Sequence, residues 1–369
     1  MPLKTLSGDH GSVRKGRGAT LNIEGRFETT AREAFDDGWD TPADDDLPKL
    51  VTTVTHETAK SIITRNASPD LPFTQSVNPY RGCEHGCIYC YARPSHAYLG
   101  LSPGIDFETR LFAKVNAAEL LRAELARPGY RCEVISLGAN TDPYQPIERE
   151  LRITRSILEV LAECRHPFGI VTKSALVERD IDILAPMARD GLCNVYVSVN
   201  NLDHELSRRL EPRTSAPLRR LQAIRRLSEA GIPVGVLVAP VIPFLTDHQI
   251  EAVLEAVYEA GARSAGYVLM RLPWELKDLF KAWLEQHYPL KAAHVMSRVR
   301  QMRDGRENDP DFGTRMKGSG EFAALLARRF DIACKRIGIN TDKRNRELDT
   351  TLFRPPRPAP VDTGQMSLF

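Results

Sequence analysis

Short apolar runs and amphipathic segments alternate along the middle of the chain. Runs typical of buried strands occupy residues 75–80, 132–138, 168–172, 194–200, 233–239 and 265–272. Segments with helical spacing occupy residues 117–126, 153–164, 181–188, 217–230, 247–260 and 274–286. Strands that alternate with helices in this way predict an α/β fold with a parallel sheet and right-handed crossovers. Six repeats fit a doubly wound sheet or a barrel, and periodicity alone does not choose between them.

The two ends of the chain differ from this middle part. Residues 1–72 show little periodicity and are interpreted as a flexible or wrapping extension. Their basic run at 14–18, RKGRG, fits a contact with a phosphate backbone or a solvated tail. Residues 291–350 form a basic helical extension, in which an amphipathic segment at 320–337 fits a helix packed on the core or a nucleic-acid surface. Residues 351–369 are a Pro-rich tail, which leaves 73–290 as the core.

Polar residues gather just after the predicted strands. They follow the first four strands in turn, at 81–91, 138–144, 172–174 and 198–201, and the segment 239–243 follows the fifth. Barrel enzymes place their active sites at the carboxyl ends of the strands. We therefore expect these segments to face one cavity, and this favours a barrel.

Composition, charge and cysteine spacing indicate where in the cell the protein works. The chain has 369 residues, 42% of them hydrophobic, and a net charge of +2, so no global field points to a partner. Its seven cysteines are irregularly spaced apart from one trio, which favours a reducing cytoplasm over a disulfide framework. The N-terminus has no signal-peptide core, and no run approaches the roughly 18 apolar residues of a membrane span. We expect a cytoplasmic protein without a membrane partner.

The trio itself is the main chemical signal. Cys83, Cys87 and Cys90 stand at C-x3-C-x2-C spacing in a Gly-flanked loop. Iron–sulfur clusters usually have four cysteine ligands, so three suggest a 4Fe-4S cluster with one iron open to a cofactor or substrate. A zinc site with His85 as fourth ligand is the alternative, but no second half of a zinc motif follows.

This spacing, with Tyr89 before the last cysteine, resembles the radical S-adenosylmethionine superfamily. The resemblance implies an incomplete barrel of six β/α units, a 4Fe-4S cluster and S-adenosylmethionine, which is cleaved reductively to a 5′-deoxyadenosyl radical. It also implies an electron donor such as flavodoxin or ferredoxin. Within the superfamily, residues 73–290 resemble the spore photoproduct lyase-like group, often labelled DNA repair photolyase. The strings that carry this likeness are NPYRGC at 78–83, TDPYQPIE at 141–148, TKS at 172–174, LEPR at 210–213 and APVIP at 239–243.

The groups of S-adenosylmethionine suggest roles for the residues after the strands. Asp142 can hold the ammonium beside Asn140, and Lys173 can pair with the carboxylate. Ser198 can bind the carboxylate or the ribose. The remaining candidates border the adenine or flank the pocket: Tyr89, Ala239, Thr172, Ser174 and Arg213. Asp142 and Ser174 are equally suited to turns or helix caps, and Arg213 with Glu211 fits either a pocket closure or an ordinary ion pair.

One departure concerns the hydrogen donor. Spore photoproduct lyases carry a cysteine in the loop after the second strand, beside the residue that matches Asp142. Here residues 138–142 read GANTD, without a thiol. Tyr91 or Tyr144 can relay a hydrogen atom instead, and both are candidate catalytic residues with the cysteine trio. The other four cysteines fall in predicted strands or helices, where a small buried hydrophobic role is the default.

The chain ends in a possible docking peptide. Gln365, Met366, Ser367, Leu368 and Phe369 resemble the peptide with which bacterial repair and replication proteins dock on the sliding clamp. The sequence thus predicts a lyase-like radical enzyme that acts on DNA or RNA, with DNA repair as the first candidate process. The alternatives are modification of tRNA or protein, and a non-enzymatic iron–sulfur protein associated with DNA.

Overall fold

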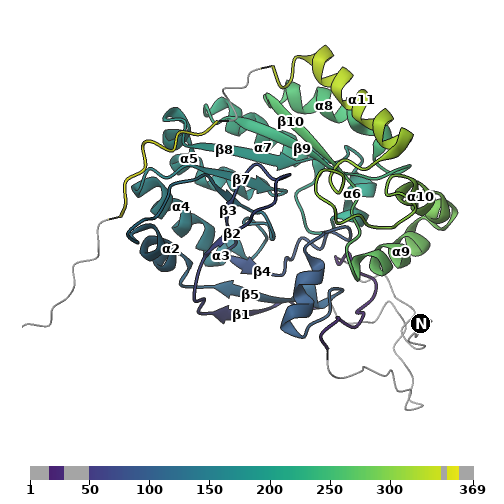
Figure 1. Ribbon diagram of the computed structural model, residues 1–369, viewed down its shortest axis with the longest axis horizontal. Helices are drawn as coiled ribbons and strands as arrows, with labels where there is room; N and C mark the ends of the chain where they lie inside the picture. Colours follow the sequence, from purple (N-terminus) through teal and green to yellow (C-terminus); the bar gives the residue numbers. More distant parts are fainter. Residues whose placement is uncertain (1–15, 29–49, 342–346, 357–369) are drawn as a thin grey trace, which may run out of the picture.

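The computed structural model describes residues 16–28, 50–341 and 347–356 (Figure 1). Its main sheet has seven strands in the order β10-β9-β8-β7-β6-β3-β2. Neighbours from β3 to β10 pair in parallel and in chain order, whereas β2 pairs antiparallel with β3. The strands are β2 Ile63–Arg65, β3 Gln75–Val77, β6 Ile135–Leu137, β7 Phe168–Thr172, β8 Cys193–Ser198, β9 Val234–Val241 and β10 Ser264–Leu269.

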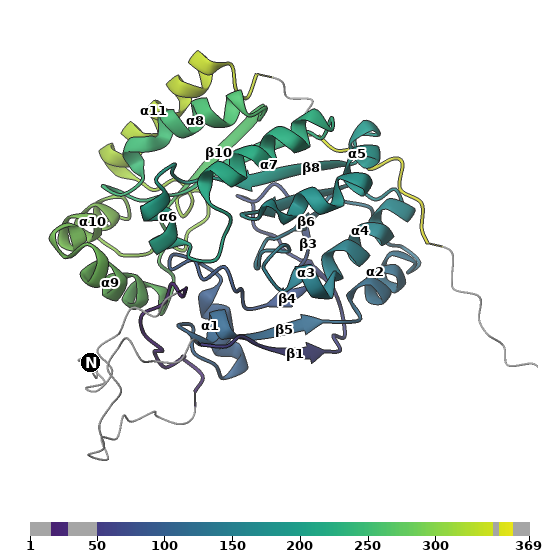
Figure 2. The ribbon, with the colours of Figure 1, turned by 180° about the vertical axis from the view of Figure 1, so that it is seen from behind.

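Helices lie around the outside of this sheet, as both ribbon views show (Figures 1 and 2). The longer ones are α2 Ala117–Leu125, α4 Ile153–Glu163, α5 Ile181–Arg189, α6 His204–Leu210, α7 Pro217–Glu229, α8 Ile250–Glu259, α9 Leu276–His287, α10 Pro289–Gln301 and α11 Gly320–Ile337. The short ones are α1 Asp106–Thr109, α3 Glu148–Leu151 and the 3-10 helices η2 Arg93–Leu99, η3 Ala175–Asp180 and η4 Asp247–Gln249. The predicted α/β fold with six parallel strands and intervening helices is confirmed.

An ion pair links the two edges of the sheet. Asp70, in the loop between β2 and β3, accepts two hydrogen bonds from Arg315, at 2.6 Å from Nε and 2.5 Å from Nη2. The residue after Arg315, Met316, accepts a hydrogen bond from the Leu269 amide at the end of β10. Because β2 and β10 stand at opposite ends of the strand order, the sheet must curve to bring them together. This curvature agrees with an open, incomplete barrel.

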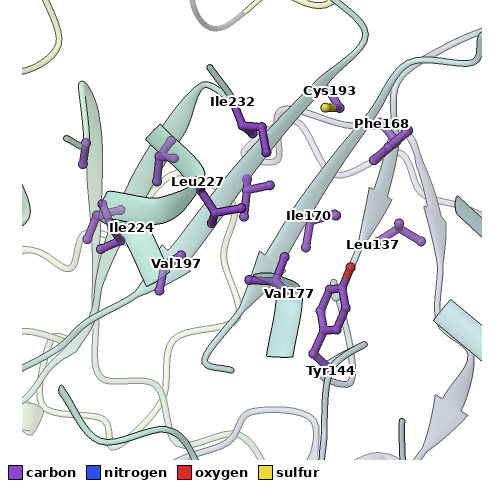
Figure 3. Packing of buried hydrophobic residues seen from close by; sticks show 14 of the residues in the cluster. Leu137, Tyr144, Phe168, Ile170, Val177, Cys193, Val197, Ile224, Leu227 and Ile232 are labelled. Carbon is purple, nitrogen blue, oxygen red and sulfur yellow. The ribbon is translucent and has the colours of Figure 1, made fainter. Parts of the chain in front are cut away.

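The core lies between one face of the parallel strands and the helices. Figure 3 shows Val197 of β8 near Ile224 and Leu227 of α7, with Ile170 and Leu137 following on the next two strands, β7 and β6. All five side chains are fully buried. Branched apolar residues on consecutive strands are typical of a parallel sheet covered by helices, and this rigid layer fixes the loops at its carboxyl end.

A smaller sheet lies beside the cysteine loop. It consists of β1 Thr53–Glu57, β5 Arg110–Lys114 and β4 Tyr80–Arg81, in the order β1-β5-β4. Both β1 and β2 belong to the residues assigned above to the N-terminal extension, and β2 is part of the main sheet. The predicted first strand at 75–80 is interrupted, since β3 ends at Val77 and β4 begins at Tyr80. Across the described residues, no helix is long and apolar enough to cross a membrane.

Candidate active site

The cysteine loop leaves β4 in a conformation that needs glycine. Gly82 and Gly86 have φ angles of 75° and 66°, in the left-handed region. The Cys83 amide donates to the Phe107 carbonyl at 2.9 Å, and a Cβ on Gly82 would meet the same oxygen at 2.9 Å. These constraints fix the loop close to α1, with the thiols of Cys83 and Cys87 buried and that of Cys90 partly exposed.

A buried ion pair holds the backbone of this loop. Arg93, fully buried, donates to the carbonyls of Cys87 at 2.9 Å and Gly86 at 3.0 Å, and to the Glu108 carboxylate. That carboxylate also accepts the amides of Gly18 at 3.0 Å and Ala19 at 2.7 Å. The N-terminal segment therefore lies against the cysteine loop through Glu108.

Arg17 corrects one reading of the basic run at 14–18. Its side chain donates to the carbonyls of Glu108 at 2.9 Å and Leu50 at 2.7 Å, and to the Thr52 hydroxyl at 2.9 Å. Arg17 is buried, so a solvated tail is wrong for this residue. Residues 14 and 15 lie outside the described part of the chain.

Gln145, which the sequence reasoning did not single out, braces the loop from the other side. Its side-chain oxygen accepts the Glu84 amide at 2.9 Å, and its Nε2 donates to the Gly82 carbonyl at 3.3 Å. Gln145 lies within the TDPYQPIE string, which the sequence marks as a motif without indicating a role for this residue. This string therefore helps to hold the backbone of the cysteine loop.

The thiols themselves suit a metal centre. Burial raises the pKa of Cys83 and Cys87 well above the usual value, and the neighbouring thiols raise it further. Nearby Lys173 acts in the opposite direction on the pKa of Cys87. Thiolates buried in this way need a cationic partner, and iron is one that cysteine readily binds. The three residues therefore fit a 4Fe-4S cluster by donor type and setting.

His85, the alternative zinc ligand, has another partner. Its Nδ1 lies 3.3 Å from Oδ2 of Asp142, and both side chains are largely buried. No three His, Cys, Asp or Glu side chains within residues 16–28, 50–341 and 347–356 gather as ligands of a single ion. The pairing with Asp142 favours the cluster over zinc.

Asp142 connects three parts of the site. It accepts the Thr172 hydroxyl and the Lys173 amide, both at 2.7 Å, and the Tyr144 amide at 2.9 Å. Burial alone would raise its pKa, but the His85 charge and these donors outweigh burial and lower the pKa to about 2. Asp142 thus ties the loop after β6 to the end of β7. Its predicted contact with the ammonium of a cofactor stays a prediction.

Among the neighbours of Asp142, Thr172 and Ser174 use their side chains in hydrogen bonds within the described part of the chain, whereas Asn140 does not. The Thr172 hydroxyl donates its hydrogen bond to Asp142, and Ser174 caps η3 by accepting the Leu176 amide at 3.2 Å. Asn140 is held through its backbone amide, which donates to Asn78 at 2.9 Å. Its side chain has no hydrogen-bond partner among the described residues. Ser174 therefore has the capping role that its sequence also allowed.

Lys173 faces the cysteine loop. Its Nζ lies 5.8 Å from the centre of the Tyr89 ring, and its charge acts on Cys87. No carboxylate in the described part of the chain forms an ion pair with it. An ammonium group in this position is suited to an anionic partner beside the cysteines.

Tyr89 leads into a buried polar network. Its hydroxyl donates to Glu211, which also accepts from Arg220. Arg220 donates to the Ser198 carbonyl at 2.9 Å and the Thr214 hydroxyl at 2.6 Å, and it is almost fully buried. The Ser198 hydroxyl has no hydrogen-bond partner within the described residues. Arg220 was missed because it stands among four arginines of α7, where nothing in the sequence marks one as buried.

Arg213 pairs with Glu84 at 3.1 Å, which ties it to the cysteine loop. Its neighbour Glu211 pairs instead with Arg220, so each takes a partner outside the LEPR string. Ala239 is partly buried on β9. Its contact with adenine stays a prediction.

The two tyrosines proposed as relays differ in position. Tyr91 is 50% exposed, donates to the Ala139 carbonyl after β6, and lies 5.7 Å beneath the Arg271 guanidinium. Tyr144 is fully buried in the core and donates to Asp180 at 3.1 Å (Figure 3). Burial and the Asp180 charge raise the pKa of Tyr144. This position argues against a relay through Tyr144 and leaves Tyr91 as the candidate.

The remaining cysteines lie apart from this loop. Cys164, Cys193 and Cys334 are buried, as expected of small core residues. Cys132 is partly exposed and precedes β6, so it stands at the opposite end of the strand from the loop that carries Asp142. None of these four supplies a thiol beside Asp142.

Comparison with known proteins now places the chain. The family model described as "Radical SAM superfamily" matches residues 77–257, which include the cysteine loop and four of the parallel strands. The chain belongs to the radical SAM superfamily. It is 39% identical over 234 residues to an uncharacterized protein of Mycobacterium tuberculosis (strain ATCC 25618 / H37Rv), covering 63% of this chain and 68% of that protein. An uncharacterized protein of Methanocaldococcus jannaschii is 29% identical over 213 residues, 58% of this chain and 76% of its own.

Solved structures show the same fold. A mutant of spore photoproduct lyase aligns with a TM-score of 0.56 and 17% identity, covering 78% of this chain and 80% of its own. Spore photoproduct lyase complexed with dinucleoside spore photoproduct aligns with a TM-score of 0.55 over the same shares. The predicted superfamily and fold are confirmed. Residues 365–369, the predicted clamp peptide, lie outside the described residues, and the cytoplasmic location stays a prediction.

Proposed function

We propose that this radical SAM protein cleaves S-adenosylmethionine reductively at a 4Fe-4S cluster and directs the radical to a nucleic-acid substrate. The observation that carries the proposal is the cysteine loop, immobilised by Arg93, Glu108 and Gln145, with the ammonium of Lys173 facing it. When bound, the cluster and S-adenosylmethionine supply a 5′-deoxyadenosyl radical. The superfamily implies both groups, and the chain's residues hold and orient them.

Each residue has a distinct task in this proposal. Cys83, Cys87 and Cys90 bind iron. Lys173 pairs with the cofactor carboxylate, and its Nζ lies 5.8 Å from the centre of the Tyr89 ring. The half-exposed Tyr91 follows the last cysteine directly, so its phenol is the group best placed to exchange a hydrogen atom with a substrate or with solvent.

The nucleic-acid part has two supports. Spore photoproduct lyase, whose fold the chain shares, has been solved with a dinucleoside lesion bound. Residues 291–357 carry 16 Lys and Arg against 9 Asp and Glu, and such an excess favours contacts with phosphates. The loop after β6 lacks a thiol, so a hydrogen atom returned to the substrate would come from a group other than a cysteine of this loop. Modification of RNA or protein remains the alternative outcome of the same chemistry.

The decisive assay measures 5′-deoxyadenosine. The chain is reconstituted anaerobically with iron and sulfide, then given dithionite in place of a flavodoxin or ferredoxin, and S-adenosylmethionine. We expect release of 5′-deoxyadenosine from the wild type and from Cys132→Ala, but none from Cys87→Ala. A reconstituted wild type that holds its cluster and releases no 5′-deoxyadenosine would support the non-enzymatic alternative. Stimulation by single-stranded DNA, RNA or protein then identifies the substrate class.

The clamp peptide is tested separately. Pull-down with a bacterial sliding clamp should retain the full chain and lose the variant lacking Gln365–Phe369, because a short extended peptide binds through its apolar side chains. Equal recovery of both forms, or of neither, would remove this partner without affecting the assay above.

A further inference from the structure

Three exposed aromatic rings surround one arginine near the cysteine loop. Phe27, Tyr98 and Trp274 are 53%, 71% and 65% exposed. The Arg26 guanidinium lies 4.2 Å from the centre of the Trp274 ring, 5.5 Å from that of Phe27 and 5.8 Å from that of Tyr98. We call these four residues the aromatic patch. Large apolar rings gathered at the surface mark interaction sites more often than isolated ones do.

Trp274 is held in an unfavourable conformation. Its φ is 51°, in the left-handed region that bulky residues avoid. Leu272, two residues earlier, is fully buried and anchors the turn, whereas the Trp274 side chain points away from the core. This turn therefore directs the Trp274 ring to the surface, and backbone strain of this kind clusters at ligand-binding sites.

The preceding β/α unit repeats this arrangement. After β9, Ile242-Pro243-Phe244 matches Leu272-Pro273-Trp274 after β10. Phe244 has a φ of 61° and is 40% exposed, and Ile242 is fully buried. Two consecutive turns at the carboxyl end of the sheet thus present an aromatic ring on a left-handed residue after a proline. The repetition shows that the exposed ring is a regular product of this turn.

The aromatic patch is connected to the active site through the chain. Tyr98 lies in η2, which begins three residues after Cys90. Trp274 follows Arg271, whose guanidinium lies over the Tyr91 ring at 5.7 Å. The Nε of Arg271 is buried without a hydrogen-bond partner, and no carboxylate of the described residues pairs with this side chain. Arg271, three residues before Trp274, is therefore a cation suited to an anionic group.

We propose that the aromatic patch binds unpaired nucleobases of the substrate strand, stacked on Trp274 and Tyr98, while Arg271 contacts an adjacent phosphate. Rings that alternate with arginine are typical of single-strand binding, because every base offers a π-face and every linkage a negative charge. The proposal rests on the proposed function for its substrate class and adds where the strand lies.

The test measures binding of labelled oligonucleotides to the full chain by fluorescence anisotropy, without reductant or S-adenosylmethionine. We expect Trp274→Ala to weaken binding of a single-stranded DNA about 5- to 150-fold, the range expected for loss of one stacked base. Trp274→Phe keeps a ring and should retain most of the affinity. Leu218→Ala is the control, because Leu218 is 71% exposed on α7 and lies outside the patch. RNA of the same sequence and a DNA duplex distinguish the two strand types and the need for unpaired bases.

Three results would overturn the proposal. They are wild-type binding by Trp274→Ala, an equal loss in Leu218→Ala, and no binding of any oligonucleotide by the wild type. Thermal unfolding monitored by circular dichroism ensures that the variants are compared in the folded state. The proposed function fails on a separate measurement, the absence of 5′-deoxyadenosine from the reconstituted wild type, so the two failures can be told apart.

Discussion

Gly18→Ala should detach the N-terminal segment from the cysteine loop. A Cβ at residue 18 would overlap the Gly86 carbonyl oxygen and approach its carbon to 3.0 Å. Backbone on both sides of this contact leaves no flexible side chain to move aside. Either residues 16–20 or the cysteine loop must shift, and Arg93 and Gln145 hold the backbone of the loop.

The cost follows from the bonds that such a shift breaks. The Gly18 and Ala19 amides donate to the Glu108 carboxylate at 3.0 and 2.7 Å. Hydrogen bonds to a charged group contribute about 1.5–3 kcal/mol each, so losing both destabilises this region by roughly 3–6 kcal/mol. Glu108 would then keep Arg93 as a partner but lose two of its donors. Because Arg93 holds the carbonyls of Gly86 and Cys87, the loop should retain its cluster less well.

The assay compares iron and sulfide per chain after anaerobic reconstitution, and the rate of cluster loss in air. Gly16→Ala is the control in the same segment. It adds the same methyl group in open space at a φ of 80°, which costs only about 1 kcal/mol of backbone strain. We expect Gly18→Ala to hold clearly less iron than both the wild type and Gly16→Ala. Equal iron content and equal air stability in the two variants would refute the role assigned to this segment.

Two further predictions concern stability. Arg220→Met removes the cation that pairs with buried Glu211, and we expect a loss of about 3–5 kcal/mol in urea unfolding of the cluster-free chain; a loss below about 1 kcal/mol would show that Glu211 is not held as a charge. His166 is fully buried, and burial lowers its pKa to about 4. His166 therefore becomes protonated near pH 6.5 in the unfolded chain but only near pH 4 in the folded chain. As a result, the free energy of unfolding falls by up to about 3 kcal/mol as the pH drops from 6.5 to 4. His166→Asn should reduce this slope without abolishing it, because burial also lowers the pKa of His96 to about 4; an unchanged slope between pH 4 and 6.5 would contradict the assignment.

The sequence was most informative where one local pattern decides the structure. The amphipathic segment at 320–337 became α11 with the same bounds, because its apolar stripe has one consistent period. The six parallel strands were found for the same reason, although β6 is shorter than residues 132–138. The three cysteines defined their loop because their spacing needs no distant partner.

What the sequence did not reveal depends on distant partners. Arg17 is buried by Glu108, 91 residues away, and no local pattern distinguishes it from a solvated arginine. Residues 53–57 do not alternate strictly in exposure, and β1 pairs along its whole length with β5. The Asp70–Arg315 pair spans 245 residues. Such contacts are products of the folded sheet, so local periodicity carries no record of them.

Polar residues at the ends of the strands posed a different difficulty, since bracing a loop and binding a cofactor require the same residue types at the same places. The two uses can be separated by asking whether a side chain already has a hydrogen-bond or ion-pair partner within the protein. Thr172 has spent its hydroxyl on Asp142, whereas the ammonium of Lys173 has no ion pair within the described residues. Thr172→Val should therefore lower iron content, because Asp142 loses a donor near the cysteine loop. Lys173→Met should leave iron content close to that of the wild type and raise the KM for S-adenosylmethionine about 10-fold or more, since a charge-assisted bond is lost. The reverse pattern, with iron lost in Lys173→Met and KM raised in Thr172→Val, would refute this reasoning. It would show that a side chain's existing hydrogen bonds do not distinguish residues that hold the loop from residues that bind the cofactor.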